Sequence, residues 1–157
     1  MIMRKQFGTL LSEEMKKNEN IWLLAGDIGY GVLDMAQPHA HNMGASEQLM
    51  LGAAVGLTYE GKIPVCYAIT PHLLLRPAEW IRNYLGYEGA PVKLVGAGRD
   101  RDYDNLGFTH WCEEDLDLLN VIAPNVRMFY PDTKDNLKNL FDEFLYCPQP
   151  AYLNLRR

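Results

Sequence analysis

A single carboxylate stands at the start of a segment that has little other polarity. Residues 42–57 read NMGASEQLMLGAAVGL, in which Glu47 precedes a run of small and apolar residues. A helix that is apolar on nearly every face is a buried helix. Glu47 could be a helix-start carboxylate stabilised by the N-terminal dipole. It could instead be a desolvated carboxylate that faces a ligand and shares a proton with it.

Three other polar motifs carry weaker signals. GDIGYG, at 26–31, could cradle a phosphate, but it is neither a dinucleotide fingerprint nor a P-loop, and a turn is the simpler interpretation. His39 and His41 form an HxH pair that could bind a metal, although no carboxylate or cysteine accompanies it at a defined spacing. His110, in GFTHW, reads by itself as a surface histidine. None of these motifs assigns a function alone.

An alternation of helices and strands must position these side chains. Amphipathic or capped segments predict five helices, the last of them capped by Asp132: about 3–17, 46–59, 75–86, 113–122 and 132–146. Short apolar runs predict five strands: 21–26, 63–69, 91–97, 126–130 and 151–155. Apolar strands joined by helices are typical of a mostly parallel sheet covered on both faces. The predicted fold class is therefore three-layer α/β, with residues 1–157 as one domain.

The order of these elements indicates where a ligand would bind. In parallel sheets, ligands bind beyond the carboxyl ends of the strands. The segments expected there are 26–44, 70–75 and 98–111, and together they hold all four histidines. Two of the three segments are long, which in a compact domain is typical of functional loops.

The composition argues against several classes of protein. A net charge of −5 argues against nucleic acid or an anionic membrane as the main partner, but it allows a local basic site for a phosphorylated ligand. The three cysteines are far apart, which predicts inert thiols rather than a zinc site or a disulfide framework. The first twenty residues do not resemble a secretory signal, and no apolar run reaches the ~18–20 residues of a membrane span. We therefore expect a soluble, cytoplasmic protein.

Several segments in combination resemble the transketolase family. NMGASEQLMLGAAVGLTYEG (42–61) is similar to its Gly-x-x-Glu-Gln motif at the start of a small-residue helix. LGFTHWCEEDLDLLNVIAPNVRMFYPDTKDN (106–136) is similar to its Gly-x-Thr-His run and the Glu-Asp, Pro-Asn and Pro-Asp that follow. GDIGYG sits where the family has Gly-x-x-Asp-Leu, and PAYLNLRR (150–157) resembles the last strand of its pyrimidine-binding domain. The resemblance implies a thiamin diphosphate-binding fold and the pyrimidine-binding (Pyr) module.

The resemblance also implies roles for individual residues. Glu47 matches the glutamate that hydrogen-bonds a ring nitrogen of the cofactor's aminopyrimidine and promotes loss of the thiazolium proton. His110 matches the histidine that faces the substrate, and Asp27 matches the strand-end aspartate near the cofactor. Arg4 matches an arginine that contacts the acceptor's phosphate.

The chain departs from the family's pattern in the substrate pocket. Leu106 replaces an aspartate before Gly-x-Thr-His, and Tyr130 replaces an arginine that contacts phosphate. A histidine that contacts phosphate in the family falls near Gly98. These changes predict an acceptor other than an ordinary aldose phosphate, such as a nucleotide-linked keto-sugar.

Other assignments stay open. TPHLLL (70–75) replaces the aromatic pair that stacks on the pyrimidine in the family, which leaves Tyr67 or His72 to substitute. Five loop residues either line the acceptor channel or lie in solvated loops: His39, His41, Arg99, Arg101 and Asp104.

The resemblance implies a partner as well. Family members hold the diphosphate and Mg²⁺ with a Gly-Asp-Gly…Asn motif on a second, PP module, and no Gly-Asp-Gly occurs in this chain. We therefore expect a separate PP subunit, an active site shared between the two chains, and a heterotetramer with two copies of each. The expected activity is transfer of a two-carbon ketol unit between sugars or sugar derivatives. Two alternatives remain: a β-type subunit of a 2-oxoacid dehydrogenase or decarboxylase, and a non-catalytic regulatory Pyr module.

Overall fold

A six-stranded parallel sheet forms the centre of the protein, which a computed structural model describes over residues 3–157. The strands lie in the order β2-β1-β3-β4-β6-β5, and every neighbouring pair is parallel. Their bounds are β1 Ile21–Ala25, β2 Ala40–Asn42, β3 Ile63–Ile69, β4 Lys93–Ala97, β5 Arg127–Phe129 and β6 Ala151–Leu155. The first three strands of the order come from the N-terminal half of the chain and the other three from the C-terminal half.

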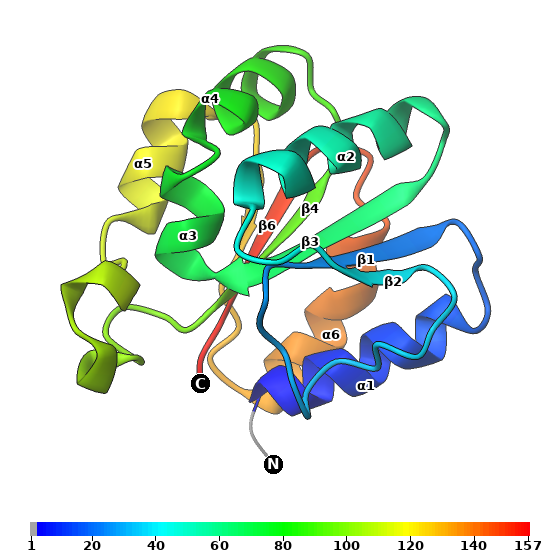
Figure 1. Cartoon of the computed structure of the whole chain (residues 1–157), viewed down its shortest axis with the longest axis horizontal. Coiled ribbons are helices and arrows are strands. Elements are labelled where there is room, and N and C mark those ends of the chain that lie inside the picture. The colour runs from blue at the N-terminus through cyan, green and yellow to red at the C-terminus, as the bar shows by residue number, and fades with distance from the viewer. Residues whose placement is uncertain (1–2) are drawn as a thin grey trace.

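Helices cover both faces of this sheet (Figure 1). One face carries α1 (Met3–Met15) and α6 (Lys134–Leu145). The other carries α2 (Glu47–Tyr59), α3 (Thr70–Leu75), α4 (Ala78–Trp80) with the π-helical segment η1 (Ile81–Tyr87), and α5 (Asp115–Ile122). The predicted three-layer α/β fold with a parallel sheet is therefore confirmed. Within residues 3–157, no helix has both the length and the apolar character that crossing a bilayer requires.

Strand β3 shows how one sheet fills two cores. Val65 and Tyr67 lie in the core shared with α1 and α6, whereas Cys66 and Ala68 lie in the core shared with α2 and α3. Side chains alternate between the two faces of a strand. Residues at odd positions of β3 therefore pack against one helical layer, and residues at even positions pack against the other.

The segment 26–44, predicted to be a loop, contains the edge strand β2. Three residues are too few for an alternating pattern to mark a strand, and β2 pairs only with β1. In this segment the His39 ring stacks on Trp22 with centroids 4.5 Å apart, and the His41 ring lies tilted against the same indole at 5.5 Å. Within the described part of the chain, no group of three or more His, Cys, Asp or Glu side chains gathers as metal ligands would.

Two helix starts also differ from the prediction. A helix begins at Thr70 rather than near residue 75, and Pro77 separates it from α4 because proline has no backbone N–H to donate. Thr133 rather than Asp132 caps α6, since its Oγ1 accepts a hydrogen bond from the backbone N–H of Asn136 at 3.1 Å. Both local corrections leave the layer arrangement unchanged.

Helix α1 meets the loop after β1 without intervening side chains. A Cβ added to Gly8 would lie 1.9 Å from the carbonyl oxygen of Val32. A hydrogen bond from Ser12 Oγ to Asp34 Oδ2, at 3.0 Å, holds the same loop against the helix. Glycine at position 8 is therefore required for this close approach.

We expect Gly8→Ala to lower the free energy of unfolding by about 1–3 kcal/mol, because the helix and loop must separate to admit the methyl group. Urea denaturation measures this change. The matched control is Gly56→Ala in α2, where an added Cβ meets nothing within 4 Å and should stabilise the helix by about 0.5–1 kcal/mol. If Gly8→Ala were as stable as Gly56→Ala, α1 and this loop would not be packed closely enough to exclude a methyl group at position 8.

Candidate active site

The carboxyl ends of the central strands lie at one edge of the sheet. The register pairs Ile69 of β3 with Ala97 of β4, and Ala97 with Leu155 of β6. The chain leaves this edge at Gly26, Thr70 and Gly98. This is the edge at which parallel α/β sheets bind ligands.

Glu47, the first residue of α2, is buried at this edge with 2% of its surface exposed. Its Oε2 accepts a hydrogen bond from Arg76 Nη1 at 2.8 Å. Its Oε1 lies 3.5 Å from the point where a Cβ on Gly26 would stand, and the Cβ of Ala68 lies 3.0 Å from that point. One carboxylate oxygen is thus paired with an arginine, and the other lies next to Gly26, where a side chain would crowd Ala68.

Arg76 is a site residue that the sequence analysis missed. It directly follows α3, and its carbonyl oxygen accepts a hydrogen bond from Gln48 Nε2 at 3.2 Å. The Glu47–Arg76 ion pair depends on how α3 packs beside α2. The spacing of residues along the sequence does not predict that packing. One signal did exist, because a fully buried carboxylate is almost never left without a partner. That rule calls for a cation near Glu47.

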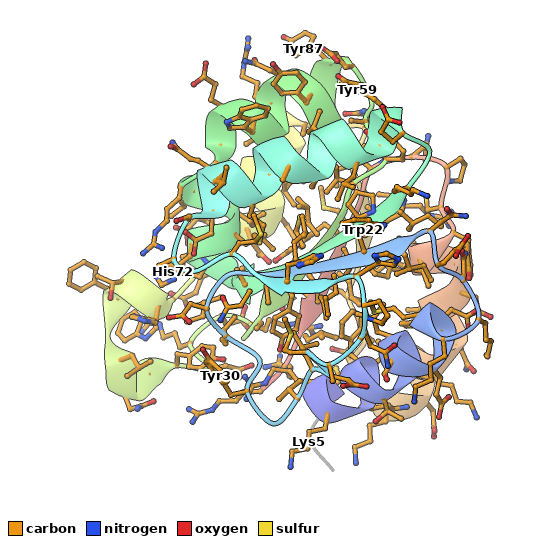
Figure 2. All side chains as sticks on the ribbon, turned by 45° about the vertical axis from the view of Figure 1, so that its right-hand side comes forward. Lys5, Trp22, Tyr30, Tyr59, His72 and Tyr87 are labelled. Carbon is orange, nitrogen blue, oxygen red and sulfur yellow. The ribbon has the colours of Figure 1, made fainter. Side chains whose placement is uncertain are left out.

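Two imidazoles meet next to this pair. His72 of α3 and His110 of the short helix η3 (Phe108–His110) have ring centroids 5.0 Å apart and planes inclined by 66°. Thr109 Oγ1 lies 2.9 Å from Nδ1 of His110, which leaves Nε2 as the nitrogen free to meet a ligand. Figure 2 shows His72 at one end of the sheet, away from Trp22 on β1. Burial, and then the Arg76 guanidinium, hold the pKa of His72 below its usual range.

The lowered pKa of His72 predicts a pH dependence of stability. A histidine in the unfolded chain, with a pKa near 6.5, binds a proton more readily than folded His72, so protonation favours unfolding. The stability that His72 contributes is fully present above about pH 6.5 and is lost as the pH falls through its folded pKa. We expect the melting temperature of the native protein to fall more between about pH 7 and pH 5 than that of His72→Phe. Parallel melting curves across that range would contradict this.

A tyrosine connects His110 to Arg4. The ring of Tyr103 is 7% exposed, and its centroid lies 6.5 Å from that of His110. Its hydroxyl accepts a hydrogen bond from Arg4 Nη1 at 2.6 Å. Six side chains thus follow the sheet edge, which we call the carboxyl-edge row: Glu47, Arg76, His72, His110, Tyr103 and Arg4.

Asp27 lies beside the carboxyl-edge row. It follows Gly26 with a φ of 52°, and its exposed carboxylate accepts hydrogen bonds from the Tyr30 hydroxyl at 3.0 Å and Asn42 Nδ2 at 3.3 Å. Asn42 Oδ1 in turn accepts from the backbone N–H of Asp27 and of Gly44. Asp27 therefore joins the end of β1 to the segment that leads into Glu47.

Of the two candidate stacking residues, only His72 lies on the side of the sheet that carries Glu47. Tyr67 points to the opposite face, where its ring stacks on Phe7 with centroids 6.1 Å apart and has no exposed surface. Tyr67 points that way because side chains alternate between the two faces of β3. The Tyr67 hydroxyl and Arg4 Nε are buried with no hydrogen-bond partner among residues 3–157.

The structure does not bring the predicted loop candidates into the row. His41 lies on the edge strand against Trp22. Arg99 is buried, where it pairs with Asp132 at 2.8 Å, donates to two backbone carbonyls and stacks on Tyr130. Asp104 is exposed at the start of the short helix η2 (Asp104–Leu106). Arg99 therefore supports the loop that carries the site rather than facing a ligand.

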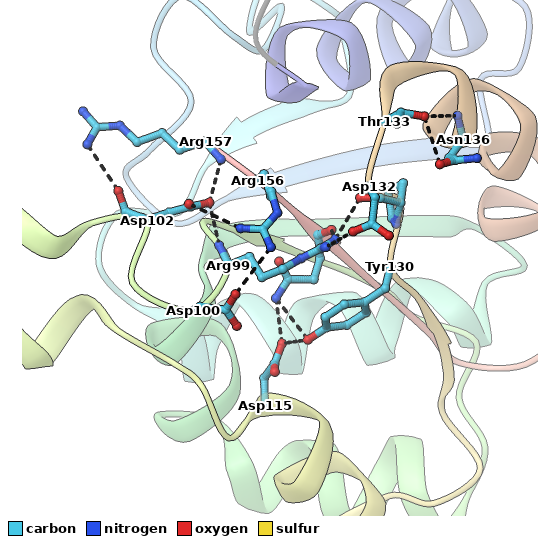
Figure 3. A network of polar contacts seen from close by, with 12 residues as sticks. Arg99, Asp100, Asp102, Asp115, Tyr130, Asp132, Thr133, Asn136, Arg156 and Arg157 are labelled. Atoms are coloured by element: carbon cyan, nitrogen blue, oxygen red, sulfur yellow. Dashed lines mark hydrogen bonds and ion pairs between the residues drawn. The ribbon is translucent and has the colours of Figure 1, made fainter.

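A buried polar cluster, seen in part in Figure 3, links Asp115 of α5 to β6 and to Tyr130, which follows β5. Asp115, which is 3% exposed, accepts hydrogen bonds from the Tyr130 hydroxyl, the Tyr152 hydroxyl at 2.7 Å and Asn154 Nδ2 at 2.6 Å. Burial and the Asp115 carboxylate hold the pKa of Tyr152 well above its usual value, so its hydroxyl remains a donor. Within this cluster, the Tyr130 hydroxyl is engaged in a hydrogen bond to the Asp115 carboxylate.

Comparison with known proteins gives a consistent result. The family model described as "Transketolase, pyrimidine binding domain" matches residues 1–157. A 6-deoxy-6-sulfo-D-fructose transketolase subunit, SqwH, from Clostridium sp. strain MSTE9 is 28% identical over 99% of this chain. One of the subunits of an apulose-4-phosphate transketolase from Actinobacillus succinogenes is 28% identical over 73% of it. A solved structure of a split gene transketolase, an inactive beta4 tetramer, covers the whole chain at 27% identity with a TM-score of 0.85.

These relatives are longer than the matched segment. The matches span 49% of the sulfofructose enzyme's subunit, 36% of the apulose enzyme's subunit and 51% of the solved split-gene chain. The chain thus spans about half the length, or less, of the relatives it matches.

Proposed function

The chain belongs to the transketolase family, as its pyrimidine-binding domain, and we propose that it serves a thiamin diphosphate-dependent transferase that moves a two-carbon ketol unit. The observation that carries this proposal is the placement of Glu47. Its carboxylate is buried at the ligand-binding edge of the sheet, with Oε2 bound to Arg76 and Oε1 next to Gly26. We further propose that residues 1–157 are a single domain of this kind.

The residues of the carboxyl-edge row fit the cofactor. Because position 26 is glycine, no side chain from that position covers Glu47 Oε1, and His72 offers an imidazole close by. Glu47 would therefore hold the aminopyrimidine, with His72 against its ring and Asp27 at its border. When bound, thiamin diphosphate supplies the nucleophilic carbon that breaks and forms the carbon–carbon bond.

The chain's own groups then have distinct tasks. Glu47 exchanges a proton at Oε1, while Arg76 holds Oε2 and so fixes the orientation of the carboxylate. His110 presents Nε2 to a hydroxyl of the substrate, because Thr109 engages Nδ1. Burial of the Glu47 carboxylate strengthens its interaction with a bound group.

We propose a separate PP subunit as the partner, which carries Gly-Asp-Gly…Asn and holds Mg²⁺ and the diphosphate, in a heterotetramer. The relatives named as transketolase subunits support this division. Their names specify a sulfofructose and apulose 4-phosphate, so such relatives differ in their sugars. Leu106, Gly98 and Tyr130 support an acceptor other than an ordinary aldose phosphate, such as a nucleotide-linked keto-sugar.

A cofactor titration tests the proposal. Thiamin diphosphate and Mg²⁺ are added to this chain alone, and to its mixture with a candidate PP subunit from a neighbouring gene, and near-ultraviolet circular dichroism is recorded. Binding in the mixture that Glu47→Ala abolishes is the expected result. Cofactor binding that Glu47→Ala leaves unchanged would contradict the proposed role of Glu47. A strong kinetic preference for ribose 5-phosphate would contradict the proposed acceptor.

A further inference from the structure

The ring of Tyr103 lies directly on the backbone at the end of the central strand β4. Gly98 follows this strand with a φ of 92°. A Cβ at position 98 would lie 2.4 Å from Tyr103 Cε2 and 2.6 Å from Cδ2. Because no side chain fits at position 98 beneath the ring, Gly98 and Tyr103 together shape this part of the sheet edge.

The surroundings hold the Tyr103 ring in place. The neighbouring Asp102 accepts hydrogen bonds at Oδ2 from the backbone N–H of Arg99 at 3.0 Å and of Arg157 at 2.8 Å (Figure 3). The guanidinium of Arg157 lies 5.1 Å from the ring centroid, and Arg4 donates to the hydroxyl. Turning the ring away would break its hydrogen bond with Arg4 and its contact with the Arg157 guanidinium.

Tyr103 also stands between His110 and Arg4. Its ring neighbours that of His110, and its hydroxyl engages Arg4 Nη1 at 2.6 Å. The guanidinium of Arg4 lies 5.6 Å from the ring centroid, where the π face stabilises a cation. Tyr103 thus satisfies part of Arg4's hydrogen-bonding capacity from within the chain.

We propose that Tyr103 determines acceptor specificity by lying between His110 and Arg4 and binding the Arg4 guanidinium. This inference rests on the proposed function, because it places an acceptor at His110. The substrate class that fits is a carbonyl acceptor whose end nearest Arg4 carries no phosphate. A sugar phosphate that uses Arg4 as its anchor is disfavoured, because the Tyr103 hydroxyl already binds that guanidinium.

Phosphate binding to the purified chain tests this proposal. Inorganic phosphate and then glyceraldehyde 3-phosphate are titrated by calorimetry, with glyceraldehyde as the uncharged counterpart. We expect Tyr103→Ala to bind both phosphates roughly tenfold more tightly than the native chain, because the freed guanidinium can make a charge-assisted bond. Tyr103→Phe keeps the ring but removes the hydroxyl that binds Arg4, so its gain should be smaller than that of Tyr103→Ala. Adding Arg4→Ala to Tyr103→Ala should abolish the gain.

Two outcomes would overturn the proposal: equal phosphate affinity of the native chain and Tyr103→Ala, or a gain that persists without Arg4. If thermal denaturation shows that Tyr103→Ala does not fold, Tyr103→Leu provides the same comparison with more apolar volume over Gly98. The titration needs neither thiamin diphosphate nor a partner subunit. Its failure is therefore distinguishable from failure of the cofactor titration, which tests the proposed function.

Discussion

The Glu47→Gln variant is expected to lose about 10²- to 10⁴-fold in transferase turnover while it keeps the native fold. Glutamine has nearly the shape of glutamate but no carboxylate with which to exchange a proton. Arg76 loses its ionic partner, yet its side chain is 44% exposed and can be solvated, so the cost in stability is small. Turnover is measured with the PP subunit, thiamin diphosphate and Mg²⁺ at saturation.

The matched control for this prediction is Glu60→Gln. Glu60 lies at the opposite end of the same helix, where it is exposed. The substitution removes the same charge from α2 without touching the carboxyl-edge row, and we expect turnover to remain at the native level. Equal losses in the two variants would show that the charge of α2, rather than a proton held at Glu47, supports the activity.

The second large effect concerns folding. We expect Asp115→Ala to lower the free energy of unfolding by about 3–5 kcal/mol, because it removes the acceptor of the buried Tyr152 hydroxyl and the part-buried Tyr130 hydroxyl and one acceptor of Asn154. A domain of this size is stable by only about 5–15 kcal/mol, so the loss is a large part of the total. Urea denaturation followed by circular dichroism measures it.

Asp117→Ala controls for the charge that this variant removes. Asp117 lies in the same first turn of α5 but is exposed, so its loss should cost only the helix-dipole contribution of about 0.3–1 kcal/mol. If Asp115→Ala were no more destabilising than Asp117→Ala, the buried cluster would not stabilise the fold as its hydrogen bonds indicate.

Local sequence patterns were sufficient to predict the layer architecture. Apolar strands such as β3 and β4, separated by helical segments, leave few arrangements other than a parallel sheet covered on both faces. The patterns were insufficient at β2 and α3, because elements of three and six residues are too short for a hydrophobic period to be read. Thr133 and Asp132 are both good caps, and only the turn geometry selects between them.

The sequence by itself determined that Glu47 is the central candidate, since one carboxylate among small apolar residues has few explanations and its motif resembles a known one. Only the tertiary structure decided which side chains accompany it. Arg76, His72, His110, Tyr103 and Arg4 come from separate segments, and the packing of α3 and the 98–111 loop brings them to one edge. The pleat of β3 likewise decided that Tyr67 faces α1. A sequence pattern shows the period of a strand or helix, whereas the distance between residues of different elements depends on how those elements pack.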